Sequence, residues 1–130
     1  MPSRHDARAR AVALLFEADV RGRPIIDVVR AHEASDDPPP AFASEIVRGV
    51  SAELSVLDTL IGAHSEDWRL DRMPVVDRNI LRLATWELLH SDVPTAVAID
   101  EAVTLAKDLS TESSGRFVNG ILGRIAETRP

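Results

Sequence analysis

Two arginines near the N-terminus, Arg4 and Arg8, have the type and spacing needed to bind an anion. They lie one helical turn apart and continue the apolar stripe that Ala11, Val12 and Leu15 would form on a helix. Two guanidinium groups cannot be buried on such a face without partners. Either the first turns of this helix extend beyond the body of the protein, or the arginines face a groove that holds an anion such as a phosphate. A solvated, frayed N-terminus is the alternative.

A third arginine lies beside an aromatic residue, at Arg116 and Phe117, directly after the polar run of residues 110–115. A cation and an aromatic ring at the start of a helix could stack on an unpaired base of RNA. The alternative is that Phe117 belongs to the core and Arg116 to the surface. One carboxylate, Glu87, lies near the middle of an apolar helix face, where it needs a partner. It is predicted to hold an arginine or backbone amides inside the protein, or else to lie at an interface.

The residue types on which most enzymes depend are absent or scattered. The chain has no cysteine, which excludes a cysteine nucleophile, a disulfide framework and a thiolate zinc site. Its four histidines include no pair at i and i+4, and neither a glycine-rich phosphate loop nor a nucleophile elbow occurs. We therefore predict a binding protein that is not an enzyme and that uses no metal and no cofactor.

Composition and charge are typical of a single globular domain that binds charged partners. The 130 residues are 45% hydrophobic and 28% charged, and no stretch or N-terminal segment is apolar enough for a membrane span or a secretory signal, so a cytoplasmic location is predicted. The net charge is −6, but residues 1–30 carry six arginines against four acidic residues, a net charge of +2. The other 100 residues carry 9 basic and 17 acidic residues, a net charge of −8. The acidic part of the chain fits a basic protein partner, and the arginine-rich start fits phosphate.

Helical periodicity dominates the chain and predicts a compact all-α bundle of six to seven helices. Gly49 and Ser51 are expected to break the third helix, and Gly62 to end it. The irregular segment near residues 66–73 is the expected join between two subdomains. Four predicted helices cover about residues 4–20, 25–34, 41–61 and 74–90. A fifth is expected to have Asp92 as its N-cap and Pro94 in its first turn, and the last is expected to have Ser113 or Ser114 as its N-cap.

Several segments follow one family pattern in order and spacing. Residues 74–89, P-V-V-D-R-N-I-L-R-L-A-T-W-E-L-L, are similar to P-x-V-D-R-A-I-L-R-L-A-x-Y-E-L. Residues 92–107 resemble D-V-P-x-x-V-A-I-N-E-A-V-E-L-A-K, and residues 117–122 match F-V-N-G-V-L. Residues 7–16 are similar to A-R-x-x-A-x-Q-A-L-Y. Together these patterns resemble the NusB family over essentially the whole chain.

The resemblance implies a transcription antitermination factor that binds the boxA element of nascent ribosomal RNA. It implies a heterodimer with NusE, a small-subunit ribosomal protein, within the antitermination complex of RNA polymerase. The fold implied is one RNA-binding domain of two perpendicular three-helix bundles, at about residues 1–65 and 66–130. The single-stranded RNA would lie on the starts of the first and last helices, at Arg4, His5, Arg8, Ser113, Arg116 and Phe117. Phe16 and Asp77 would border the NusE surface.

The chain departs from the family pattern at both ends of the implied RNA site. His5 and Asp6 stand where basic residues are common, and Ser113 and Gly115 replace an aspartate and a histidine. We therefore expect weak RNA binding without the protein partner. Two alternatives are a homodimeric protein-binding module without RNA binding, and a stand-alone relative of the accessory domain of RNA cytosine methyltransferases. Members of the family occur as monomers and as homodimers, and a homodimer could cover the arginine face.

Overall fold

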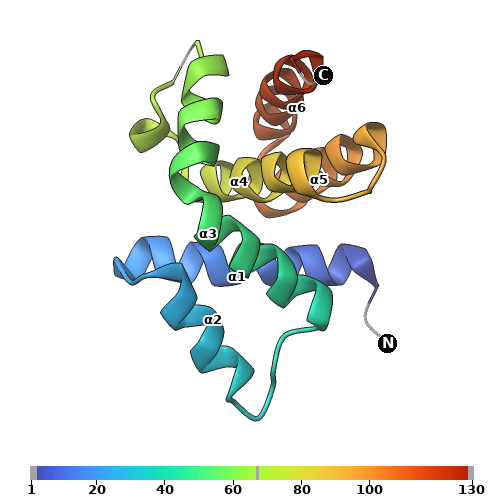
Figure 1. The fold of residues 1–130 in the computed structure, drawn as a ribbon. Coiled ribbons are helices and arrows are strands. Elements are labelled where there is room, and N and C mark those ends of the chain that lie inside the picture. Colours follow the sequence, from blue (N-terminus) through green and yellow to red (C-terminus); the bar gives the residue numbers. More distant parts are fainter. Residues whose placement is uncertain (1–2, 67, 129–130) are drawn as a thin grey trace.

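The computed structural model describes residues 3–66 and 68–128, which form six α-helices, one short 3-10 helix and no strand (Figure 1). The predicted all-α fold is therefore confirmed. Across these two segments, no helix has the length and apolar character needed to cross a membrane. The elements in chain order are α1 (Arg4–Arg21), α2 (Ile25–Glu33), α3 (Ala41–His64), η1 (Leu70–Arg72), α4 (Val75–His90), α5 (Thr95–Leu109) and α6 (Glu112–Glu127).

Prolines mark the starts of four helices. Each has φ between −52° and −57° and an extended ψ, and proline loses nothing at this position because it has no backbone N–H to leave unpaired. The expected cap at Asp92 is wrong, because α5 begins only at Thr95. The N-caps of α2, α3, α4 and α5 are Pro24, Pro40, Pro74 and Pro94.

The two helices whose starts carry the predicted RNA site, α1 and α6, each have a hydroxyl side chain as N-cap. Ser3 Oγ accepts a hydrogen bond from a first-turn amide of α1 at 3.0 Å, and Gly22 ends this helix with φ +64°. Thr111 Oγ1 accepts a hydrogen bond from the Ser114 amide at 3.0 Å. The expectation that Ser113 or Ser114 caps the last helix is wrong, because α6 begins at Glu112, directly after Thr111.

The third helix continues through the expected break. α3 runs without interruption from residue 41 to 64, so Gly49 and Ser51 do not divide it and Gly62 does not end it, although it bends along its length (Figure 1). The reason for the glycine is packing, since a Cβ at Gly49 would lie 2.2 Å from Cε2 and Nε1 of Trp86. The indole ring of α4 therefore packs directly on the backbone of α3.

The helices pack in two groups of three, and α4 of the second group also packs against the first group. α1, α2 and α3 contact one another, α4, α5 and α6 contact one another, and α4 also packs on both α1 and α3. An ion-pair network strengthens this junction, because Asp19 of α1 accepts hydrogen bonds from Arg78 at 2.8 Å and from Arg82 at 3.1 Å. Arg82 also donates to Asp58 of α3 at 2.8 Å. The division into subdomains near residue 65 stays a prediction.

Candidate nucleic-acid interface

Arg4 and Arg8, which the sequence places on one face, do not have the same surroundings, because Arg8 points into the protein. Its guanidinium donates to Glu87 through Nε (2.9 Å to Oε2, 3.2 Å to Oε1) and through Nη2 (2.9 Å to Oε1). Arg8 is 3% exposed and Glu87 is 0% exposed. The prediction that Arg8 lies open to RNA is therefore wrong, since a carboxylate of its own chain occupies its donors. The prediction that Glu87 holds an arginine inside the protein is confirmed.

Arg4 differs from Arg8 because it is exposed. Its guanidinium carbon lies 4.6 Å from the ring centroid of Phe42, and that of Arg8 lies 5.2 Å from the same ring. Phe42 opens α3, so the start of α3 orients the start of α1 through two cation–π contacts. The contact restrains the stem of Arg4 while leaving its charge at the surface.

His5 joins the start of α1 to the middle of α5. Its Nδ1 lies 2.9 Å from Oε2 of Glu101, and the pair is half-buried. The hydrogen bond to Glu101 raises the pKa of His5 above its usual 6.5, and the negative charges of Glu101, Asp108 and Asp6 act in the same direction. His5 is therefore held by a carboxylate of its own chain, and a role in RNA binding stays a prediction.

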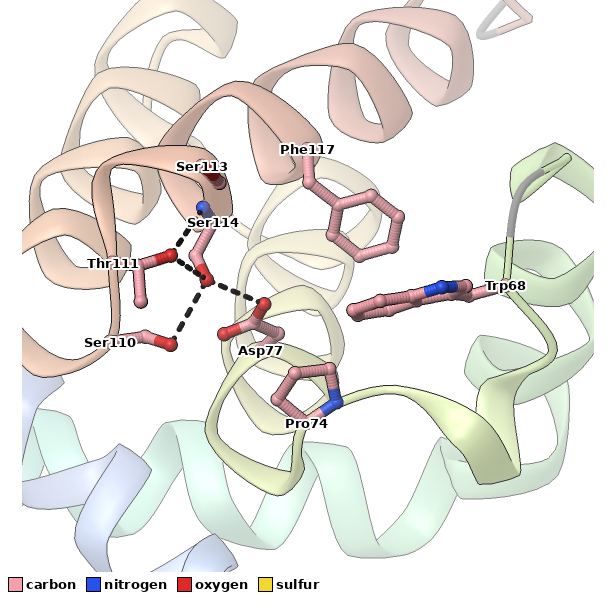
Figure 2. Close-up of a pocket in the computed structure, with 8 residues that line it drawn as sticks. All are labelled: Trp68, Pro74, Asp77, Ser110, Thr111, Ser113, Ser114 and Phe117. Carbon is pink, nitrogen blue, oxygen red and sulfur yellow. Dashed lines mark hydrogen bonds between the residues drawn. The ribbon is translucent and has the colours of Figure 1, made fainter.

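A buried carboxylate of α4 accepts a hydrogen bond from the start of α6. Asp77 is 1% exposed, and its Oδ2 accepts a hydrogen bond from Ser114 Oγ at 2.8 Å. Ser114 Oγ also lies 3.0 Å from the hydroxyls of Ser110 and Thr111 (Figure 2). The carboxylate is buried between α4 and α6 and anchors the α6 start, and the expectation that Asp77 borders the NusE surface stays a prediction.

Beside this anchor, the predicted aromatic residue lies half-buried at the edge of a pocket. The ring of Phe117 meets Trp68 at a centroid separation of 5.4 Å and an angle of 55° (Figure 2). Arg116 is exposed and donates to Ser113 Oγ at 3.3 Å. The pocket has a volume of about 450 Å³, which is enough for one nucleobase, and Ser113 and Pro74 also line it. Three of the predicted residues, Ser113, Arg116 and Phe117, thus lie together.

α5 links the two starts of the predicted site. Glu101 holds His5, while the side chain of Lys107 crosses the backbone at Gly115, where an added Cβ would lie 2.8 Å from Lys107 Cγ. These two positions on α5 are six residues apart, which corresponds to about 9 Å along the helix axis. α5 therefore contacts the starts of both α1 and α6, on faces that lie about 120° apart around its axis. Lys107 places its side chain beside the first turn of α6.

The predicted partner residue on α1 lies on a different face. Phe16 is 39% exposed and Val20, one turn later on the same helix, is 59% exposed. Two large apolar side chains one turn apart form an exposed apolar strip, a feature that is more common at protein contacts than elsewhere on a surface. The strip supports the predicted role of Phe16, which nothing in the geometry tests directly.

Three residues of the site were missed by the sequence reasoning. Trp68 lies in the irregular segment before η1, Phe42 reads only as one member of an apolar stripe, and Lys107 reads as an exterior charge. All three act across helix junctions, so periodicity along one helix gives no signal for them. The only signal for Trp68 is that a large aromatic residue occurs in a segment without helical pattern.

Fold and site together define a small helical binding module. Two exposed arginines, Arg4 and Arg116, lie at helix starts, and residues 3–66 and 68–128 contain no group of three or more His, Cys, Asp or Glu side chains that could hold a metal ion. The model of the NusB family matches residues 5–127. The chain therefore belongs to the NusB family.

Curated relatives agree in both sequence and length. The chain is 52% identical to the transcription antitermination protein NusB of Salinispora tropica, over 98% of this chain and 97% of the relative. It is 48% identical to the protein of the same name from Thermobifida fusca, over 98% of this chain and 92% of the relative.

Solved structures share the fold. NusB of T. maritima matches with a TM-score of 0.85 and 40% identity, over 98% of this chain and 93% of that one. A chain from the crystal structure of the antitermination factors NusB and NusE in complex with dsRNA matches with a TM-score of 0.79 and 30% identity, over 97% of both chains.

Proposed function

We propose that this protein is a transcription antitermination factor that binds the boxA element of nascent ribosomal RNA together with NusE. Its relatives along the full chain are named antitermination proteins, and a similar structure contains NusB, NusE and RNA. The observation that supports the RNA site is that Arg4 is exposed at the α1 start and Arg116 is exposed beside the aromatic pair Phe117 and Trp68 at the α6 start, and α5 contacts both helix starts. The protein acts by binding and has no catalytic step.

The residues divide the work by their chemistry. The guanidiniums of Arg4 and Arg116 hold phosphates, while the ring of Phe117 stacks on an unpaired base. The α6 start adds amide N–H groups and the positive end of its dipole. Arg8 serves as a positioning residue, because its buried pair with Glu87 fixes α1 against α4 and so places Arg4.

NusE binds the exposed face of α1 that carries Phe16. Phe16 and Val20 supply the apolar part of that contact, and the acidic body of the chain attracts a basic ribosomal protein. RNA that contacts both proteins is then held more tightly than by either one alone, because the second contact is intramolecular. This protein accordingly works in the cytoplasm within an RNA polymerase antitermination complex.

The test is a titration of labelled boxA RNA at several salt concentrations, with and without NusE. The double variant Arg4→Ala and Arg116→Ala is expected to weaken binding and to lower the slope of log K against log salt by about 1.4, which is 0.7 for each lost phosphate contact with single-stranded RNA. Arg30→Ala is the matched control, because Arg30 is an exposed arginine on α2, away from the proposed site.

Unchanged affinity and slope in the double variant, with helical content intact, would contradict the proposed site. A wild-type protein that binds NusE but not boxA RNA, alone or with NusE, would favour the alternative of a protein-binding module instead.

A further inference from the structure

Glu101 of α5 contacts two of the residues that the sequence predicts to bind RNA. Its Oε2 lies 2.9 Å from His5 Nδ1 and 3.9 Å from Arg8 Nη1. The side chains of His5 and Glu101 are 39% and 30% exposed, so both groups are accessible from the surface. Glu87, by contrast, is 0% exposed and stays bound to Arg8. Of these two carboxylates, only that of Glu101 is open to a ligand from solution.

The Glu101 carboxylate occupies a position on His5 that suits a phosphate. A protonated histidine donates to a carboxylate oxygen and to a phosphate oxygen in the same way, because both are anionic acceptors. The hydrogen bond to Glu101, together with the negative charges of Glu101, Asp108 and Asp6, raises the pKa of His5 above 6.5 and so favours its protonated form. His5 therefore has the donor that a phosphate needs, but Glu101 already accepts from it.

The charges around His5 favour Glu101 over an incoming phosphate in the free protein. The guanidinium of Arg8 attracts the Glu101 carboxylate toward α1, while Asp6 and Asp108 repel a second anion. Arg4 is exposed one residue before His5 and attracts the phosphate. A strand of RNA is thus drawn to the α1 start by Arg4 but meets a histidine that is already bonded.

We propose that Glu101 is a built-in competitor of RNA, and that an RNA phosphate must replace its carboxylate on His5 before the α1 start binds fully. The inference rests on the proposed RNA-binding function and adds a residue that limits the affinity of the same site. The contact lowers the affinity of the free protein for RNA. Stable binding then requires the additional contacts that NusE provides, because these offset the displacement of Glu101.

The size of the effect follows from the exposure of the pair. Both side chains are about one-third exposed, and an ion pair of this kind changes an equilibrium constant by a factor of about 1.5–5. RNA binding is weakened by that factor when Glu101 must be displaced. The negative charge of Glu101 also repels RNA at a distance, and the loss of another acid on α5 measures this second effect separately.

The experiment measures the affinity of the full chain for fluorescent boxA RNA without NusE, at one salt concentration. Glu101→Ala is expected to bind this RNA about 2–5-fold more tightly than Asp100→Ala. Asp100 is the matched control, because it is an exposed carboxylate at the neighbouring position of α5 and its loss changes the net charge by the same amount. In a His5→Ala background, the gain from Glu101→Ala should fall to that of the control, because the donor that Glu101 releases is missing.

An NMR pH titration of the His5 imidazole tests the contact without RNA. Glu101→Ala should lower the pKa of His5 toward 6.5, whereas Asp100→Ala should leave it close to its wild-type value. An unchanged pKa of His5 in Glu101→Ala would refute the contact itself. Equal RNA affinity of Glu101→Ala and Asp100→Ala, with the pKa of His5 lowered as expected, would overturn the competition while leaving RNA binding intact. Binding of boxA RNA by none of the variants, with or without NusE, would overturn the proposed function instead.

Discussion

Replacing Arg8 with alanine is expected to unfold the protein at a markedly lower temperature without changing how RNA binding depends on salt. The substitution leaves the carboxylate of Glu87, which is 0% exposed, buried without the three hydrogen bonds of 2.9–3.2 Å that now satisfy it. Breaking a buried ion pair from one side costs about 3–5 kcal/mol. For a chain of this size that corresponds to a fall in the melting temperature of about 10–20 °C.

Thermal and urea unfolding of three variants isolates the pair. Arg10→Ala is the matched control on the same helix, because its partner Asp37 is 92% exposed, so that their ion pair is worth at most about 1 kcal/mol. The double variant Arg8→Met with Glu87→Leu should lose less stability than the sum of the single changes, since it leaves no unpaired charge. A melting temperature for Arg8→Ala as high as that of Arg10→Ala would show that the pair of Arg8 and Glu87 does not stabilise the fold. A reduced salt dependence of RNA binding in the same variant would show that Arg8 contacts RNA.

Two further predictions concern pH and helix packing. Because Glu101 raises the pKa of His5, this pair stabilises the fold fully below pH 6.5, and the contribution is lost as the pH rises through the raised pKa. The pair is about one-third exposed, so we expect His5→Gln to lower the free energy of unfolding by only about 0.2–1 kcal/mol at pH 6 and not to lower it at pH 9. Urea unfolding at both pH values measures this, and an equal loss at both would exclude a protonation effect. Gly49→Ala should destabilise the fold by about 1–3 kcal/mol and alter Trp86 fluorescence, because the new Cβ would overlap the indole ring. Gly62→Ala on the same helix meets nothing within 4 Å and should stabilise by about 0.5–1 kcal/mol; the opposite order in calorimetry would contradict this packing.

Much of the helical fold could be predicted because each helix carries its own apolar stripe. The predicted range of 25–34 differs by one residue from α2, and that of 74–90 by one residue from α4. The failures occurred where contacts between helices override local signals. Gly49 has a low helix propensity, yet α3 continues through it, and its missing Cβ leaves the space that the Trp86 ring fills.

The site was only partly predictable for a related reason. Helical spacing placed Arg4 and Arg8 on the same face, but it could not show that Arg8 reaches a carboxylate 79 residues later while Arg4 stays exposed. The sequence predicts the partner of Glu87 only as an arginine, backbone amides or an interface, and it gives no residue. Trp68 lies in an irregular segment, so its contact with Phe117 follows only from the tertiary fold.

The most direct test of the central claim is an NMR titration of the isotope-labelled protein with boxA RNA. We predict that the largest shifts of backbone amides fall at Arg4, Arg116 and Phe117, on the two helix starts, and that the amides around Phe16 change only when NusE is added. RNA-induced shifts confined to α2 and the Phe16 face, with the α1 and α6 starts unchanged, would contradict it.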